Sequence, residues 1–146
     1  MEIVEISRDS ISEIEHLWCE LNELHFIKSD NFKEHYASFS FSDRIEKLLQ
    51  AELLAVYAAK IGSELVGYCI ASVTNDSGEV DSLYVKPQYQ GSSIGKQLIQ
   101  SALSWLSDQN CHQVNISVAV GNEEVIPFYE KLGFRKRSYM LQIRTL

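Results

Sequence analysis

A run of small and polar residues, Gln90-Gly-Ser-Ser-Ile-Gly95, separates an alternating apolar segment from an amphipathic one. This placement predicts a loop that leads from a strand into a helix. The first amides of a helix have no acceptor within it and lie at the positive end of its dipole, and small residues let a phosphate approach them. The spacing matches neither a Gly-Lys-Ser/Thr loop nor Gly-x-Gly-x-x-Gly. The loop indicates a diphosphate site, although a tight turn without a ligand explains the same residues.

Two neighbouring motifs strengthen the interpretation of this loop as a ligand site. Leu83-Tyr-Val-Lys-Pro87 precedes it, and Asn122-Glu-Glu-Val-Ile-Pro-Phe-Tyr129-Glu-Lys-Leu-Gly-Phe134 follows one expected strand later. Here the sequence resembles the GNAT superfamily of acyl-CoA-dependent N-acyltransferases. That family's cofactor motif is Gln/Arg-x-x-Gly-x-Gly/Ala, and this chain has Gln90-x-x-Ser93-x-Gly95. Ser93 therefore stands where the family usually has glycine, and Val125 replaces a common alanine in the later motif.

The resemblance implies that acetyl-CoA binds in a cleft where two parallel strands splay apart. Backbone groups of the strand would face the pantetheine arm, at Leu83, Tyr84 and Val85. The loop and helix start would surround the diphosphate, at Gln90, Gly91, Ser92, Ser93, Ile94, Gly95 and Lys96. Asn122 would touch the cofactor arm, cap the last helix, or do both.

Two side chains are implied to act in catalysis. Tyr129 matches the family tyrosine that protonates the departing thiolate. A core tyrosine packed behind Phe128 is the alternative. Asp81 aligns with the carboxylate that serves as base in the polyamine-like branch of the family, and Glu79 is the reserve candidate. Strand alternation predicts Glu79, Asp81 and Leu83 on one face. A solvated strand carboxylate remains the alternative for Asp81, and a backbone amide near Val85 is the candidate oxyanion donor.

The acceptor side is implied to involve the N-terminal helices. This region combines aromatic residues with acidic ones, which suits a cationic amine through charge and cation–π contact. Aromatic residues at helical spacing also suit a core. The aromatic residues are Trp18, His25, Phe32, Tyr36, Phe39 and Phe41, and the acidic ones are Glu20, Glu23, Asp30 and Glu34.

Hydrophobic periodicity and turn residues predict the elements that position these groups. Strands are expected over residues 1–7, 53–61, 64–74, 79–85, 112–120 and 134–144. Helices are expected over 10–25, 42–49, 92–108 and 123–132, with a short helix or mobile segment within 27–41. Ser10 and Glu13 form a capping-box pattern. The order predicts a mixed α/β fold of the α+β kind, with a parallel crossover over 79–120. The resemblance implies a GNAT-like fold: a mostly antiparallel sheet, splayed at a parallel strand pair and flanked by helices.

Length and charge limit the other possibilities. A chain of 146 residues with 45% hydrophobic and 23% charged residues is expected to form a single globular domain, residues 1–146. The net charge of −7 argues against nucleic acid. Residues 1–80 carry −9 and residues 81–146 carry +2, which would suit a cationic substrate and an anionic cofactor, although solvated surface charge explains the same distribution. We expect no membrane span, no signal peptide, no metal site and a cytoplasmic location.

The resemblance implies an N-acetyltransferase that moves an acetyl group from acetyl-CoA to a primary amine of a small molecule or protein, by direct attack in a ternary complex. A non-catalytic acyl-CoA-binding or sensor module with the same fold is the alternative, and an interaction scaffold is a third. Tyr129 favours the enzyme, whereas Ser93 and the short Asp81 permit the module. The family also makes a homodimer plausible, formed through the C-terminal strand.

Overall fold

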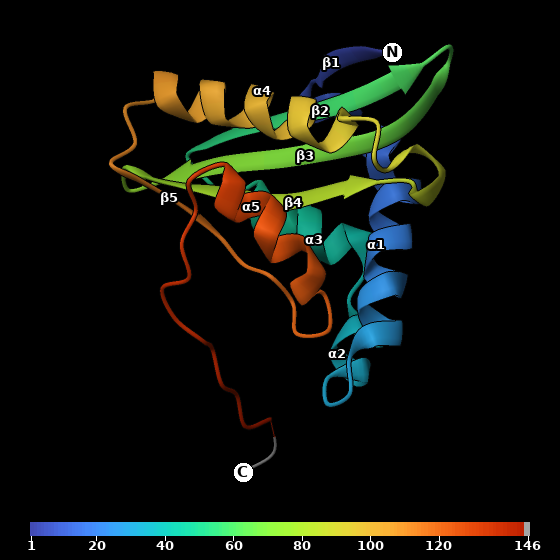
Figure 1. The fold of residues 1–146 in the computed structure, drawn as a ribbon, viewed down its shortest axis with the longest axis vertical. Coiled ribbons are helices and arrows are strands. Elements are labelled where there is room, and N and C mark those ends of the chain that lie inside the picture. The colour runs from blue at the N-terminus through green and yellow to red at the C-terminus, as the bar shows by residue number, and fades with distance from the viewer. Residues whose placement is uncertain (145–146) are drawn as a thin grey trace.

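Five strands form one sheet in the computed structural model, which describes residues 1–144. Strands β1 to β4 pair antiparallel with their neighbours, and β4 pairs parallel with β5. The strands lie in chain order across the sheet (Figure 1). Their bounds are β1 (Glu2–Ile6), β2 (Leu53–Ile61), β3 (Glu64–Thr74), β4 (Ser77–Val85) and β5 (Gln113–Ile116). This mixed sheet confirms the predicted fold class.

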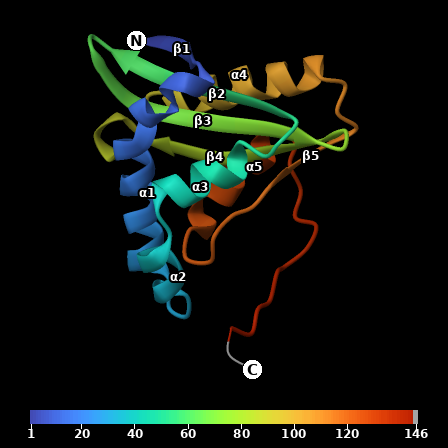
Figure 2. The ribbon, with the colours of Figure 1, turned by 180° about the vertical axis from the view of Figure 1, so that it is seen from behind.

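Helices cover both faces of the sheet. Helices α4 (Ile94–Asp108) and α5 (Ile126–Lys131) lie on one face, and α1 (Glu15–Lys28) and α3 (Phe41–Leu48) lie on the other (Figures 1 and 2). Helix α2 (Lys33–Ser38) packs against α1. Three 3-10 helices complete the set: η1 (Arg8–Ile14), η2 (Pro87–Tyr89) and η3 (Glu123–Val125). Within residues 1–144, no helix is long and apolar enough to span a membrane.

Each face of the sheet has its own hydrophobic core. On the α4 side, Val66, Leu98 and Leu106 are buried together with the small residues of β3. On the α1 side, Leu17, Trp18 and Tyr68 form the second cluster. The largely apolar β3 is buried along most of its length because it contributes to both clusters.

Helix starts differ from the prediction at two places. The first helical segment begins as η1 at Arg8, because the chain already turns at Ser7, whose carbonyl accepts the Ser10 amide at 3.0 Å. The predicted start at Ser10 is therefore wrong. Helix α3 begins at Phe41 rather than at residue 42, because Ser40 caps it: the Ser40 Oγ accepts the Asp43 amide at 3.1 Å.

The β4–α4–β5 segment forms the predicted parallel crossover. Strand β5 ends at Ile116 rather than at Val120, because its pairing with β4 stops at Val80 and Ile116. Beyond that point the residues stay without a strand partner on the β4 side. The early end of this pairing creates the space that the site needs.

The predicted strand over 134–144 is wrong. These residues form no helix or strand, and they run away from the sheet (Figures 1 and 2). The apolar alternation that suggested a strand is present, but residues 1–144 contain no neighbouring strand that pairs with it. The side chains at its centre are consequently exposed, with Met140 94% and Leu141 93% accessible.

Candidate active site

A cavity opens where β4 and β5 separate. Their pairing runs from Ser77–Gln113 to Val80–Ile116, and β4 continues without β5 to Val85. The cavity has a volume of about 80 Å³ and receives residues from β4, the segment after β5, α1 and α5. Its lining residues are Leu21, His25, Val80, Asp81, Ser82, Leu83, Ile116, Ser117, Val118, Ala119, Asn122, Val125 and Tyr129. Four of the predicted site residues thus lie around one space: Asp81, Leu83, Asn122 and Tyr129.

A β-bulge places Asp81 at this cavity. Ile70 of β3 pairs with Ser82 and Ala71 pairs with Val80, so Asp81 is the extra residue of β4. The bulge shifts the alternation, and Leu83 packs with Val80 in the core on the α4 side. Glu79, next to Val80, alternates to the opposite face and is exposed. The prediction that Glu79, Asp81 and Leu83 share a face is therefore wrong, and Glu79 does not line the cavity.

The Asp81 carboxyl is buried, and few polar groups replace the water that it loses. Its Oδ2 has no hydrogen-bond partner in the structure. Burial raises the pKa of Asp81 from 3.8 to about 6, Glu79 adds to the rise, and the Ser72 hydroxyl and the Arg44 guanidinium oppose it. Arg44 also donates to the Asp81 carbonyl oxygen at 3.1 Å, which fixes the bulged backbone. A carboxylate with a pKa near 6 is a better proton acceptor at neutral pH than an ordinary aspartate.

Tyr129 approaches the same cavity from α5. Only 8% of the residue is exposed, and its ring packs edge-on against Phe128 and Phe134, with ring centroids 5.2 and 5.9 Å away. Burial raises the pKa of Tyr129 above its ordinary value, with Cys69 adding to the rise. The phenol therefore remains protonated at neutral pH and can donate its proton.

His25 of α1 is a site residue that the motifs did not single out. It lines the cavity, and its buried Nδ1 has no hydrogen-bond partner. Its ring lies 5.4 Å from that of Tyr36, between centroids. Burial lowers the pKa of His25, and the charge of Lys28 lowers it further, so the imidazole is neutral at pH 7. The only sequence signal was its place among the aromatic residues of the N-terminal helices.

Half of that aromatic group packs in the core on the α1 side instead. Trp18 and Phe41 are buried and pack edge-on at 5.7 Å between ring centroids, and Phe39 lies at the same distance from Trp18. None of the three lines the cavity. The expected aromatic lining is therefore reduced to His25, with Tyr36 behind it.

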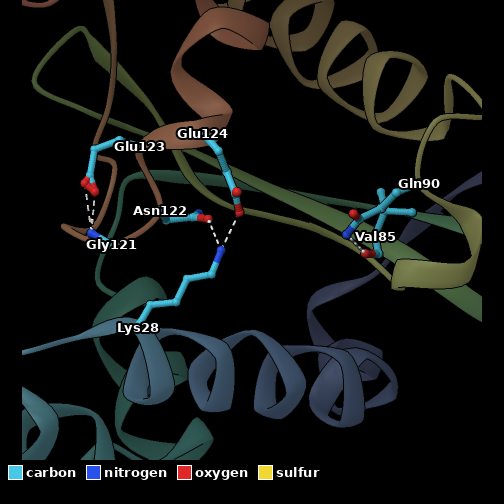
Figure 3. A network of polar contacts seen from close by, with 7 residues as sticks. All are labelled: Lys28, Val85, Gln90, Gly121, Asn122, Glu123 and Glu124. Carbon is cyan, nitrogen blue, oxygen red and sulfur yellow. Dashed lines mark hydrogen bonds and ion pairs between the residues drawn. The ribbon is translucent and has the colours of Figure 1, made fainter.

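A polar contact joins the end of α1 to the segment before α5 (Figure 3). The Lys28 ammonium donates to Asn122 Oδ1 at 3.4 Å and forms an ion pair with Glu124. The Asn122 side chain makes no capping bond, so the predicted capping role is wrong. A Cβ at Gly121, which has a φ of 100°, would lie 2.5 Å from the Lys28 carbonyl oxygen. Close approach of the two segments thus requires glycine there and holds Asn122 at the edge of the cavity.

The loop before α4 offers a row of free amides. Among the described residues, the amides of 91–96 donate no hydrogen bond within the chain. Gly91 and Ser92 are exposed, and a Cβ at Gly91 would meet no atom within 4 Å. The Gln90 side chain turns back and donates to the Val85 carbonyl at 2.9 Å (Figure 3). Free amides at the start of a 15-residue helix, with open space in front, fit a diphosphate.

Ser93 is the residue that departs from the family motif, and its backbone conformation is the one that the usual glycine would adopt. Its φ of 66° lies in the left-handed region, which glycine adopts easily and which strains other residues. Its hydroxyl caps no amide of α4 but accepts from Gln97 Nε2 at 3.3 Å. The backbone shape that a glycine would supply is therefore kept despite the serine.

The remaining predicted cofactor residues differ in which of their groups are free to contact a ligand. Lys96 is exposed on the first turn of α4. Ile94 is only 4% exposed and its side chain belongs to the core, so its amide alone is free for a ligand. The Tyr84 side chain points to the α1 side, where its hydroxyl donates to Glu20 at 3.0 Å. For Leu83, Tyr84 and Val85, the edge of β4 beyond Val80 has no β5 partner, which leaves that edge open to a ligand.

Comparison with known proteins decides the family. The model of the acetyltransferase (GNAT) family matches residues 14–134. The chain belongs to the GNAT family of acetyltransferases. Thialysine N-epsilon-acetyltransferase of Sus scrofa is 30% identical over 92 residues, which cover 60% of this chain and 54% of that protein. The chain thus spans about half the length of that relative.

Solved structures share the fold over the full chain. Aminoglycoside N-acetyltransferase AAC(6')-Iy in complex with CoA matches with a TM-score of 0.71 and 18% identity, covering 99% of both chains. Ribosomal-protein-alanine N-acetyltransferase from Brucella melitensis biovar Abortus 2308 gives the same TM-score and identity, covering 99% of this chain and 100% of that one. This GNAT chain is an N-acetyltransferase with acetyl-CoA as its acyl donor, which favours the enzyme over the non-catalytic acyl-CoA-binding module.

Proposed function

We propose that this GNAT chain transfers the acetyl group of acetyl-CoA to a primary amine of a small molecule or protein, by direct attack within a ternary complex. We further propose that residues 1–146 act as a single acetyltransferase domain, in the cytoplasm and as a homodimer. The observation that most directly supports this reaction is the cavity where β4 and β5 separate. There, Asp81, His25 and Tyr129 reach one space from three different elements.

The acceptor side of this proposal rests on two buried atoms without partners. Asp81 Oδ2 and His25 Nδ1 lack hydrogen bonds, and burying such groups unpaired is unfavourable. A primary ammonium brings three donors to them. Asp81, with its raised pKa, then accepts the proton that the amine must lose before it attacks. The named relatives act on thialysine, aminoglycosides and a protein alanine, and these names support an amine acceptor.

The donor side uses the loop and the open edge of β4. When bound, acetyl-CoA supplies the activated thioester. Free amides and small side chains would hold its diphosphate, and the backbone of β4 beyond Val80 would hold the pantetheine arm, with Asn122 beside it. The proposed diphosphate residues are Gln90, Gly91, Ser92, Ser93, Ile94, Gly95 and Lys96, and the proposed arm residues are Leu83, Tyr84, Val85 and Asn122.

Tyr129 would donate its proton to the departing sulfur. Its position in the cavity and its high pKa suit an acid that is protonated until the sulfur becomes basic. General acid catalysis contributes roughly 10²–10⁴-fold to a rate. The surrounding phenyl rings of Phe128 and Phe134 limit how far the phenol can turn.

The direct test mixes the protein with acetyl-CoA and a panel of amines: diamines, aminoglycosides, lysine analogues and N-terminal alanine peptides. Thiol release and product mass are followed together. We expect amine-dependent thiol release for at least one class, and a fall in kcat of about 10²-fold for Tyr129→Phe. Tyr57→Phe is the control, because Tyr57 lies on β2 outside the cavity. Equal turnover in the two variants would remove Tyr129 from the reaction.

A further inference from the structure

The backbone of Asp81 has no partner residue on either neighbouring strand among residues 1–144. On the β3 side, Asp81 is the extra residue of the bulge between Val80 and Ser82. On the β5 side, the pairing has already ended at Val80, which lies opposite Ile116. The extra residue of a bulge is left out of the ladder, so the strands alone do not fix the direction of the Asp81 side chain.

Arg44 of α3 supplies a contact that the sheet lacks at this point. Its Nη2 donates to the Asp81 carbonyl oxygen at 3.1 Å. One residue later, the hydroxyls of Ser82 and Tyr68 form a hydrogen bond of 2.7 Å, and Tyr68 is completely buried. The bulged backbone is therefore held by two side chains, one from α3 and one from β3.

The helix that carries Arg44 is itself firmly packed. Phe41 and Leu48 are buried in the cluster on the α1 side, and the Phe41 ring lies edge-on to Trp18 at 5.7 Å between ring centroids. Ser40 caps the first turn. The side chain that holds the Asp81 peptide thus projects from a fixed element, which is what accurate placement of a reacting group requires.

The Arg44 guanidinium has no other use within residues 1–144. It is half-buried, it forms no ion pair there, and its side chain donates only to the Asp81 carbonyl. A cation that loses water without a carboxylate partner is unfavourable, so its place beneath the bulge calls for a reason. Arg44 does not line the cavity, which excludes direct contact with an amine held there.

Arg44 is also the only cation, among the described groups, that acts on the Asp81 carboxyl. Its charge lowers the pKa of Asp81, against the effects of burial and of Glu79 on β4. Cys69 on β3 faces Asp81 as a neutral thiol, because burial raises the pKa of Cys69. His25 on α1 and Tyr129 on α5 line the same cavity and are neutral at pH 7, and the cavity residues after β5 carry no charge.

We propose that Arg44 is a positioning residue of the reaction: it fixes the bulged peptide so that the Asp81 carboxylate faces the acceptor amine, and its charge keeps that carboxylate ionised. The inference rests on the function proposed above, in which Asp81 accepts the proton of the amine. Because Arg44 contacts neither acceptor nor cofactor, its effect on the rate should pass through Asp81 alone.

The kinetic test replaces Arg44 by methionine, which removes charge and donors, and by lysine, which keeps the charge. Arg44→Met should lower kcat by up to about 10²-fold, the loss expected for a misplaced reacting group. The acidic limb of its kcat/KM profile should move to higher pH, because the Asp81 pKa loses the group that lowers it. Arg44→Lys should recover part of kcat and keep the limb near its wild-type position.

The control is Lys47→Met, which removes an exposed charge from the same helix and should change neither kcat nor the limb. The KM for acetyl-CoA should stay the same in all variants. Wild-type kcat and an unmoved limb in Arg44→Met would overturn the proposal. An equal loss of kcat on adding Arg44→Met to Asp81→Asn would overturn it too, because the effect would then bypass Asp81.

A thermal-unfolding cycle tests the same contact without the reaction. At pH 8, Asp81→Asn should raise Tm more in the Arg44→Met background than in the wild-type background, because the carboxylate has then lost its cation. At pH 4, where Asp81 is neutral in the folded chain, the two gains should be equal. Arg44→Gln, which keeps an amide donor without the charge, replaces Arg44→Met if the methionine variant does not fold.

The cycle separates this proposal from the proposed function. Equal Tm gains at pH 8 would overturn the role of Arg44, whether or not an amine acceptor has been found. Unequal gains in a chain that acetylates none of the tested amines would support the contact between Arg44 and Asp81 and would count against the reaction alone.

Discussion

Replacing Asp81 by asparagine should make the folded chain more stable and the enzyme slower. Burial raises the pKa of Asp81 from 3.8 to about 6, which means that the folded state disfavours the ionised carboxylate. One pKa unit corresponds to about 1.4 kcal/mol, so ionised Asp81 lowers the free energy of unfolding by up to about 3 kcal/mol. Asparagine has nearly the same shape and no charge. For a domain of this size, the gain corresponds to a Tm increase of up to about 10 °C.

The stability gained by Asp81→Asn should be small at low pH and should increase as the pH rises. Below about pH 4 the Asp81 carboxyl is protonated in both the folded and the unfolded chain, and its burial carries no charge penalty. As the pH rises to about 6, the unfolded chain loses the proton first and the wild-type chain loses stability. Above that pH the difference between wild type and Asp81→Asn should stay constant.

Urea unfolding at pH 4.5, 6 and 8 measures this difference, with Asp30→Asn as the control because Asp30 is exposed. At pH 8 the kcat/KM of Asp81→Asn should fall by about 10²-fold or more, since the amine loses its proton acceptor. A variant that is no more stable than wild type at pH 8 would refute the burial argument. A variant with full activity would refute the role of Asp81 as base.

Three further changes test the cofactor loop and the acid. Gly95→Ala should raise stability by up to about 1 kcal/mol, because its Cβ would meet only Val85 and Phe128 at 3.8 and 3.9 Å, yet it should weaken CoA binding in calorimetry. Unchanged CoA affinity would show that no ligand approaches this position. Ser93→Gly should relieve the strain of a φ of 66° and add up to about 1 kcal/mol in urea unfolding; a loss of stability would contradict that strain. Tyr129→Phe should lower kcat with little change in KM for the amine, and a change confined to KM would indicate binding rather than proton donation.

The parts that the sequence predicted well are those set by local patterns. The antiparallel strands β2 and β3 and helix α4 follow from periodicity and turn residues, and the crossover follows from their order. The loop before α4 was identifiable because its small residues lie between a strand and a helix.

The features that escaped prediction depend on contacts between distant segments. The bulge at Asp81 arises from the register between β3 and β4, and it moves Leu83 to the opposite face from Glu79. The burial of His25 beside the cavity depends on how α1 packs across the sheet end. No spacing within the chain encodes either contact.

The C-terminal segment shows the limit of pattern reasoning most clearly. Alternation at Tyr139, Leu141 and Ile143 indicates a strand, but it does not indicate which strand of which sheet would pair with it. Within residues 1–144 there is no strand that pairs with this segment.

The proposed reaction depends on the free amides of residues 91–96, which we propose bind the diphosphate of acetyl-CoA beside the separated strands. Calorimetric titration of the full chain with CoA tests it most directly. We expect saturable binding of one CoA per chain, reduced in Gly95→Ala and retained in the control Gln100→Ala on the exposed side of α4. Absence of heat and of saturation up to millimolar CoA would show that these amides do not form a cofactor site.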